Sequence, residues 1–170
     1  MTTDVTELKS MEVEVPATRT IACSASSSPD SNAISAALGA AFQKLEGFRT
    51  ANHIQAAGSP RVVYTEWSPG GVRFTAAIPI GEMPPPNVLD TTEVAIKAMP
   101  ETRALRFEHR GPYREIRETY NCVEAWLRAR GGIKTAADWA HYAPMWEEYL
   151  NDPVTTPESE LITRIYLTLQ

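Results

Sequence analysis

An internal repeat constrains the fold of this 170-residue chain more than any other feature of its sequence. The segment Pro16-Ala17-Thr18-Arg19 returns as Pro100-Glu101-Thr102-Arg103, a separation of 84 positions (100 − 16). Three further pairs of landmarks keep the same separation: Phe42 and Trp126, Gly47 and Gly131, Pro60 and Pro144. A fixed period of this kind indicates a duplicated structural unit. One unit has too few strands to bury its own sheet, so we expect two units joined about a pseudo-twofold axis, with a central pocket.

Hydrophobic patterning predicts the same order of elements in each half. The first half is expected to hold strands at 11–15 and 20–24, a helix from about residue 31 that Gly47 ends, and a hairpin of strands 61–67 and 72–80. The second half is expected to hold strands at 94–99 and 104–109, a helix from about Tyr113 to Arg130, and strands at 145–150 and 161–169. The predicted class is α+β, a duplicated strand-helix-strand-strand module with an antiparallel sheet and two main helices.

Proline and charge patterns define the domain organisation. Residues 1–10 are polar and predict a disordered or irregular start, and residues 11–170 predict one domain with halves at about 11–82 and 91–170. The linker Gly81-Glu82-Met83-Pro84-Pro85-Pro86-Asn87 separates them, because three consecutive prolines stiffen the backbone and withhold amide donors.

Composition excludes several classes of function. The net charge of −5 and the absence of a run of Lys or Arg argue against nucleic-acid binding. No apolar run approaches the roughly 18 residues of a membrane span. Cys23 and Cys122 are distant and lack metal-ligand spacing, so we expect free thiols, a cytoplasmic location, no metal and no cofactor. Monomer and dimer both remain open.

The strand predicted at 145–150 places two adjacent carboxylates among aromatic residues. Side chains alternate across a strand, so Glu147 and Tyr149 are expected on one face and Trp146 and Glu148 on the other. The two glutamates are therefore expected to point to opposite faces of the sheet. If one face lines a concavity, one of the two becomes an enclosed anion, which needs a cationic or hydrogen-bonding partner.

Two interpretations of Glu147 remain open from alternation alone. The simpler one is a strand carboxylate paired with an arginine such as Arg103 or Arg164. The other is a pocket carboxylate, because enclosure among aromatic rings disfavours the charged form of an acid and leaves it able to act as a general base or to attract a cation.

Several segments resemble the GyrI-like small-molecule-binding domain, also called the bacterial transcription activator effector-binding domain. The resemblance rests on the turn His109-Arg110-Gly111-Pro112-Tyr113, the run from Trp146 to Pro153 and the closing segment from Leu161 to Leu167, and it extends over about residues 11–170. It implies that Glu147, the glutamate preceding the x-Tyr-Leu pattern, stands in an aromatic pocket that meets cationic, lipophilic molecules. The ten residues before Met11 are too few for the DNA-binding domain of many relatives, so a stand-alone member is expected.

The candidate ligand-binding residues are the glutamate and the aromatic side chains expected near it. They are Glu147, Tyr149, Trp146, Tyr64, Trp67, Tyr113 and Trp139. Each aromatic residue has a plain packing role as its alternative. Under the repeat, Tyr64 aligns with Glu148 and is therefore out of phase with Glu147 unless a bulge intervenes.

Three functions are compatible with this sequence. The first is binding of amphipathic, cationic small molecules. The second is a hydrolase of small strained or ester electrophiles, in which Glu147 activates water and Tyr149 positions the electrophile. The third, which the resemblance implies, is a module that acts on a protein partner such as DNA gyrase.

Overall fold

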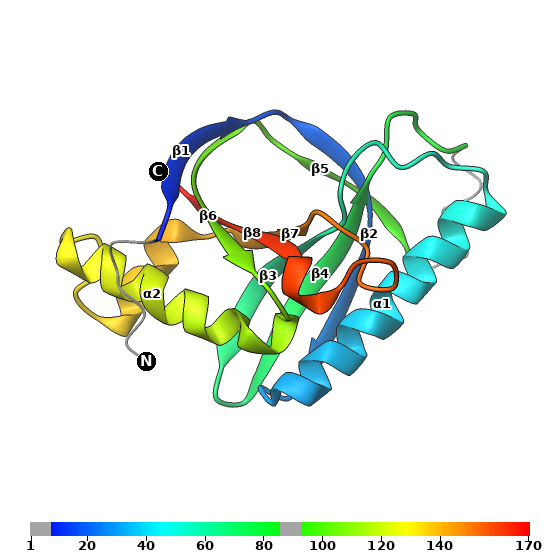
Figure 1. Ribbon diagram of the computed structural model, residues 1–170. Helices are drawn as coiled ribbons and strands as arrows, with labels where there is room; N and C mark the ends of the chain where they lie inside the picture. Colours follow the sequence, from blue (N-terminus) through cyan, green and yellow to red (C-terminus); the bar gives the residue numbers. More distant parts are fainter. Residues whose placement is uncertain (1–7, 86–92) are drawn as a thin grey trace. The chain divides into compact units, whose positions relative to one another are not determined.

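The computed structural model describes residues 8–85 and 93–170 (Figure 1). The chain divides into two compact units. We call residues 16–101 the central unit, and residues 8–15 with 102–170 the terminal unit. Most of the expected irregular start, residues 1–7, lies outside the described residues, as do Pro86 and Asn87 of the expected linker. No helix within the described ranges is long and apolar enough to cross a membrane.

The central unit is an antiparallel sheet of four strands with one long helix. Its strands are β2 (Thr18–Ser27), β3 (Arg61–Ser68), β4 (Gly71–Pro79) and β5 (Ala95–Met99), and its helix is α1 (Ser31–Ala51). Pairing gives the order β3-β4-β2-β5. The expected hairpin forms between β3 and β4, with Ser68 opposite Gly71.

Helix α1 begins where the sequence predicts and ends later. The Asp30 side chain accepts a hydrogen bond from the Asn32 amide at 3.0 Å and so caps the first turn. The prediction that Gly47 ends the helix is wrong, because α1 continues to Ala51. Phe48 lies three residues beyond Leu45 on the same buried face, and its burial favours another turn over the stop that glycine permits.

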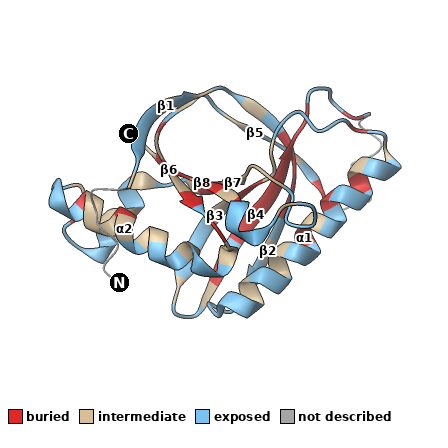
Figure 2. Cartoon of the chain, in the orientation of Figure 1, coloured by how far each residue is buried: buried red, intermediate tan, exposed pale blue. Residues whose placement is uncertain are grey.

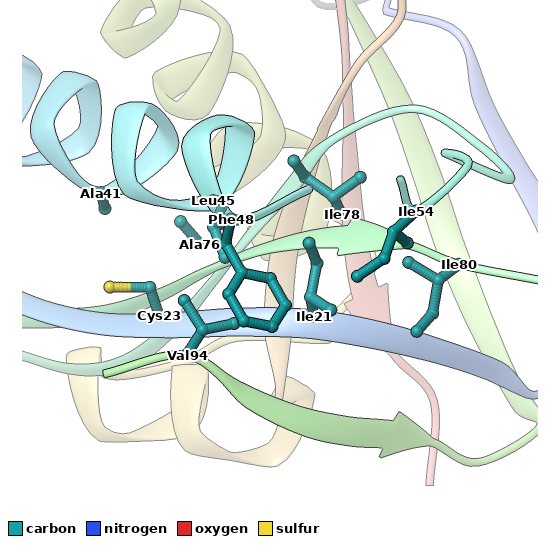
Figure 3. Packing of buried hydrophobic residues seen from close by; sticks show 10 residues of the cluster. All are labelled: Ile21, Cys23, Ala41, Leu45, Phe48, Ile54, Ala76, Ile78, Ile80 and Val94. Carbon is teal, nitrogen blue, oxygen red and sulfur yellow. The ribbon is translucent and has the colours of Figure 1, made fainter. Parts of the chain in front are cut away.

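Apolar side chains from α1 and the sheet form the core of the central unit. Figure 3 shows Phe48 among residues of the neighbouring strands, including Ile21 of β2 and Ile78 of β4. Ile21 and Leu45 are fully buried. Buried residues concentrate on the strands, whereas both long helices are exposed along much of their length (Figure 2).

The terminal unit repeats this plan. Its strands are β1 (Ser10–Val15), β6 (Thr102–Arg110), β7 (Met145–Tyr149) and β8 (Ile162–Thr168), and its main helix is α2 (Ile116–Ala129). Three short 3-10 segments accompany them: Tyr113–Glu115, Ala136–Tyr142 and Glu158–Glu160. Pairing gives the antiparallel order β1-β6-β8-β7. Val123 and Leu127 of α2 pack on Phe107 and Ile165 of the sheet.

The two units confirm the predicted α+β class, and they exchange one strand between the sequence halves. β1 opens the first half but pairs with β6 of the terminal unit, whereas β5 opens the second half and pairs with β2 of the central unit. The chain passes from one unit to the other after Val15 and again after Glu101. The repeated Pro-x-Thr-Arg segments therefore mark the two crossing points, and the compact units are not the sequence halves.

Two glycines give a matched test of the backbone. Gly111 has φ +113°, a conformation that a side chain strains, whereas Gly39 lies inside α1 with open space where a Cβ would stand. We expect Gly111→Ala to lower the free energy of unfolding by about 1–3 kcal/mol. Gly39→Ala should raise it by about 0.4–1 kcal/mol. Urea unfolding measures both, and a change of the same sign in the two variants would contradict this account of the backbone.

Candidate functional site

Strand β7 separates the two carboxylates as alternation predicts. Glu147 stands opposite Ile165 of β8, and Ile165 stands opposite Phe107 of β6. Ile165 and Phe107 belong to the core beneath α2, so Glu147 lies on the sheet face that this helix covers. Only 4% of the Glu147 residue surface is exposed. The expectation of an enclosed carboxylate is met within the terminal unit.

Two tyrosine hydroxyls donate to the Glu147 carboxylate. Tyr120 of α2 donates to Oε2 at 2.5 Å, and Tyr149 of β7 donates to Oε1 at 2.9 Å. Both carboxylate oxygens therefore act as acceptors, an arrangement that suits an ionised carboxylate. Hydrogen bonds to a charged acceptor are stronger than neutral ones and offset part of the cost of burying the charge.

A third tyrosine completes the surroundings of Glu147. The rings of Tyr113 and Tyr149 meet edge to face with centroids 5.5 Å apart. Burial raises the pKa of Tyr113, and the nearby negative charges of Asp152 and Glu147 raise it further. Tyr113 is therefore linked to Glu147 through its ring contact with Tyr149. We call Glu147 with Tyr113, Tyr120 and Tyr149 the tyrosine–glutamate cluster.

The opposite face of β7 contains a different arrangement. Arg164 of β8 lies 3.8 Å from Glu148 and 3.5 Å from Glu108. The Tyr166 hydroxyl also donates to Glu148, at 3.2 Å. Arg164, one of the two arginines considered as a partner of Glu147, therefore lies beside Glu148. Arg103 is the other arginine considered. It lies on β6, four residues before Phe107, and Phe107 is the β6 residue in the same row across the sheet as Glu147.

The other predicted aromatic residues are distributed over both units. Trp146 stacks on Tyr166 with centroids 4.8 Å apart, on the Glu148 face as alternation predicts, and its role in ligand binding stays a prediction. Trp139 packs against the core beneath α2. Tyr64 and Trp67 belong to the central unit, where their rings meet edge to face at 5.8 Å, and Trp67 is 64% exposed.

Strand pairing corrects the phase assigned to Tyr64. In the terminal unit, Tyr149 stands opposite Thr163, and Thr163 opposite His109. In the central unit, Tyr64 stands opposite Phe74, and Phe74 opposite Ala25. Ala25 and His109 are 84 positions apart, so Tyr64 is the counterpart of Tyr149 rather than of Glu148. The pair Tyr64 and Tyr149 therefore departs by one residue from the 84-position offset. The bulge in β3 does not cause this departure, because it follows Tyr64.

Sequence analysis did not assign Tyr120 to the site. Its place on the apolar stripe of the second helix, with Val123 and Leu127, is typical of a core residue. The available signal was its hydroxyl group, which needs a polar partner when it turns toward a sheet. Glu147 was the acidic residue expected on that sheet.

Surface hollows and metal-ligand geometry add no second centre. Two open hollows formed by residues within 8–85 and 93–170 lie at the turn before α2 and at the β3–β4 hairpin, and Glu147 lines neither. No group of three or more His, Cys, Asp or Glu side chains in those ranges is placed to hold a metal ion. The tyrosine–glutamate cluster is therefore the candidate site.

Known proteins with the same family pattern and the same fold are found by comparison. Residues 9–170 match the family described as the GyrI-like small molecule binding domain. The structure is similar to that of the EcmrR C-terminal domain, at 15% identity over 96% of this chain and 98% of that chain, with a TM-score of 0.74. It is also similar to SAV2435 bound to tetraphenylphosphonium (10% identity, 95% and 94% covered, TM-score 0.62) and to a hydrolase from Listeria innocua (13%, 94% and 90%, TM-score 0.59). At these identities the likeness establishes a shared fold, and no curated protein matches the sequence.

The bond from Tyr120 to Glu147 should contribute measurably to stability. Tyr120→Phe removes a donor to a buried charge, so we expect it to lower the free energy of unfolding by about 1.5–3 kcal/mol. Tyr166→Phe is the matched control, because its hydroxyl bond to Glu148 is longer and Arg164 also faces that carboxylate. The control should lose only about 0.5–1.5 kcal/mol in urea unfolding. A smaller loss for Tyr120→Phe than for the control would contradict the importance of this bond.

Proposed function

This chain belongs to the family of GyrI-like small molecule binding domains, and from that membership we propose that it binds amphipathic, cationic small molecules at the tyrosine–glutamate cluster. The single observation that carries the proposal is the burial of the Glu147 carboxylate between two tyrosine hydroxyls. A buried negative charge attracts a cation more strongly than an exposed one, because less water screens the interaction.

The aromatic rings of the cluster favour a lipophilic ligand. The faces of Tyr113 and Tyr149 present electron-rich surfaces, which attract cations that carry apolar groups. Both tyrosines are only partly buried, whereas Glu147 is almost fully enclosed. A ligand would therefore meet the Tyr113–Tyr149 pair first and would reach Glu147 by displacing the Tyr149 hydroxyl. Tyr120 would remain as the donor that holds the carboxylate in place.

Charge removal at Glu147 tests this proposal. Tetraphenylphosphonium serves as the cationic probe and triphenylphosphine oxide as a neutral probe with similar aromatic groups. We expect Glu147→Gln to weaken binding of the cation at least tenfold, about 1.4 kcal/mol, and to change binding of the neutral probe by no more than about twofold. Isothermal titration calorimetry measures both dissociation constants.

Glu148→Gln is the matched control for this experiment. It removes the same charge one residue along β7, on the opposite face of the strand. The control should keep the wild-type affinity for the cation, and thermal unfolding checks that both variants are folded. Equal losses for the cationic and neutral probes, or equal losses in the two variants, would reject Glu147 as the cation-recognition group.

A hydrolase is the second candidate function. The 2.9 Å distance from Tyr149 Oη to Glu147 Oε1 favours it, because it places a hydroxyl that can position an electrophile beside a carboxylate that can act as a general base. In this reaction Glu147 takes a proton from water as the water oxygen bonds to the ester carbonyl carbon. The acyl C–O bond then breaks, the protonated Glu147 returns its proton to the departing alcohol, and the carboxylic acid remains.

Turnover distinguishes the hydrolase from the binding module. With 4-nitrophenyl butyrate as substrate, an enzyme should release nitrophenolate faster than buffer, and Glu147→Gln should lower that rate at least a hundredfold. Absorbance measures the release. A wild-type rate equal to that of buffer, or of the Gln variant, would exclude this chemistry for activated esters.

A further inference from the structure

His109 occupies a buried position at the end of β6, beside the cluster but outside it. Its exposed fraction is 4%. Ring atom Nδ1 lies 2.7 Å from the Thr119 hydroxyl of α2, and Nε2 lies 2.9 Å from the carbonyl oxygen of Pro112. Both ring nitrogens are therefore engaged, one with the helix and one with the turn that precedes it.

The partners of His109 determine its protonation pattern. A carbonyl oxygen only accepts hydrogen bonds, so Nε2 must carry a proton and donate to Pro112. In the neutral ring Nδ1 then accepts, and the Thr119 hydroxyl donates to it. The Pro112 carbonyl also accepts from the Glu115 amide at 3.0 Å, and the neighbouring Gly111 amide donates to the Leu161 carbonyl at 2.8 Å. One imidazole thus joins the turn, the helix and the end of the sheet.

Each partner of His109 immediately precedes a tyrosine of the cluster. Pro112 precedes Tyr113, and Thr119 precedes Tyr120. We propose that His109 is a positioning residue, which holds the segments bearing Tyr113 and Tyr120 in place over Glu147. This inference rests on the function proposed above and adds a residue that does not itself touch the ligand.

Strand pairing extends the same argument to Tyr149. His109, Thr163 and Tyr149 occupy one row across β6, β8 and β7, on the face that α2 covers. Thr163 is fully buried between the other two positions. The imidazole is therefore two strands away from Tyr149 and bonds to the residues before the other two tyrosines. A group at this position can set how the segments bearing Tyr113 and Tyr120 lie on the sheet that carries Tyr149.

Thr119 offers a cleaner test than His109, because replacing a buried histidine risks unfolding the chain. Thr119→Val keeps the shape of the side chain and removes the hydroxyl that bonds Nδ1, whereas Thr119→Ser keeps the hydroxyl. Val123→Ala is the matched control, since it removes buried apolar volume from the same helix without changing any contact of His109. Two measurements follow for each variant: the dissociation constant for tetraphenylphosphonium, and the Cζ chemical shifts of labelled tyrosines in the ligand-free protein.

We expect Thr119→Val to weaken binding of tetraphenylphosphonium about fivefold. The same substitution should move the Cζ resonances of Tyr113 and Tyr120, whereas that of Tyr142 should stay in place as a reference. Thr119→Ser should restore both properties, and Val123→Ala should lower the melting temperature while leaving them near wild type. The inference is overturned if Thr119→Val leaves the resonances and the affinity unchanged, or if Val123→Ala alters them as much. If the wild type does not bind the probe at all, the proposed function fails, whereas the tyrosine resonances still decide whether His109 positions these rings.

Discussion

The terminal unit depends on keeping the charge of Glu147 stable between a sheet and a helix. Enclosing a carboxylate costs several kcal/mol, and each hydrogen bond to the charge offsets about 1.5–3 kcal/mol. Tyr120 supplies one such bond from α2 and Tyr149 supplies another from β7 itself. The helix must therefore lie at a fixed height and rotation on the sheet for the bond from Tyr120 to form. A buried, hydrogen-bonded acid of this kind restricts how α2 packs on the sheet of its unit.

Much of this arrangement could be predicted from periodicity. The two-residue alternation of β7 separates Glu147 from Glu148, and the structure places them opposite Ile165 and Arg164 of β8. The 84-residue repeat predicts two units of equivalent order, which the pairing of the strands reproduces. The family match over residues 9–170 agrees with the resemblance carried by the second half.

Other features depend on contacts that local patterns do not encode. Tyr120 is 27 positions from Glu147, and its place on an apolar stripe gave no indication of its acidic partner. The phase of Tyr64 depends on one extra residue between β6 and Tyr149 of the second half (149 − 109 = 40, against 64 − 25 = 39), which a constant repeat offset cannot detect. The exchange of β1 and β5 follows from which edges pair, and alternation describes only the faces of a strand. Gly47 permits a helix to end, yet burial of Phe48 prolongs α1.

The central claim is that Glu147 is an ionised carboxylate that a cationic ligand contacts directly. Difference infrared spectroscopy tests it, with the spectrum of Glu147→Gln subtracted from that of the wild type to isolate the carboxylate stretching bands of this one residue. On addition of tetraphenylphosphonium, these bands should shift as the cation replaces the Tyr149 hydroxyl. Bands that stay unchanged while the probe is fully bound would contradict the account.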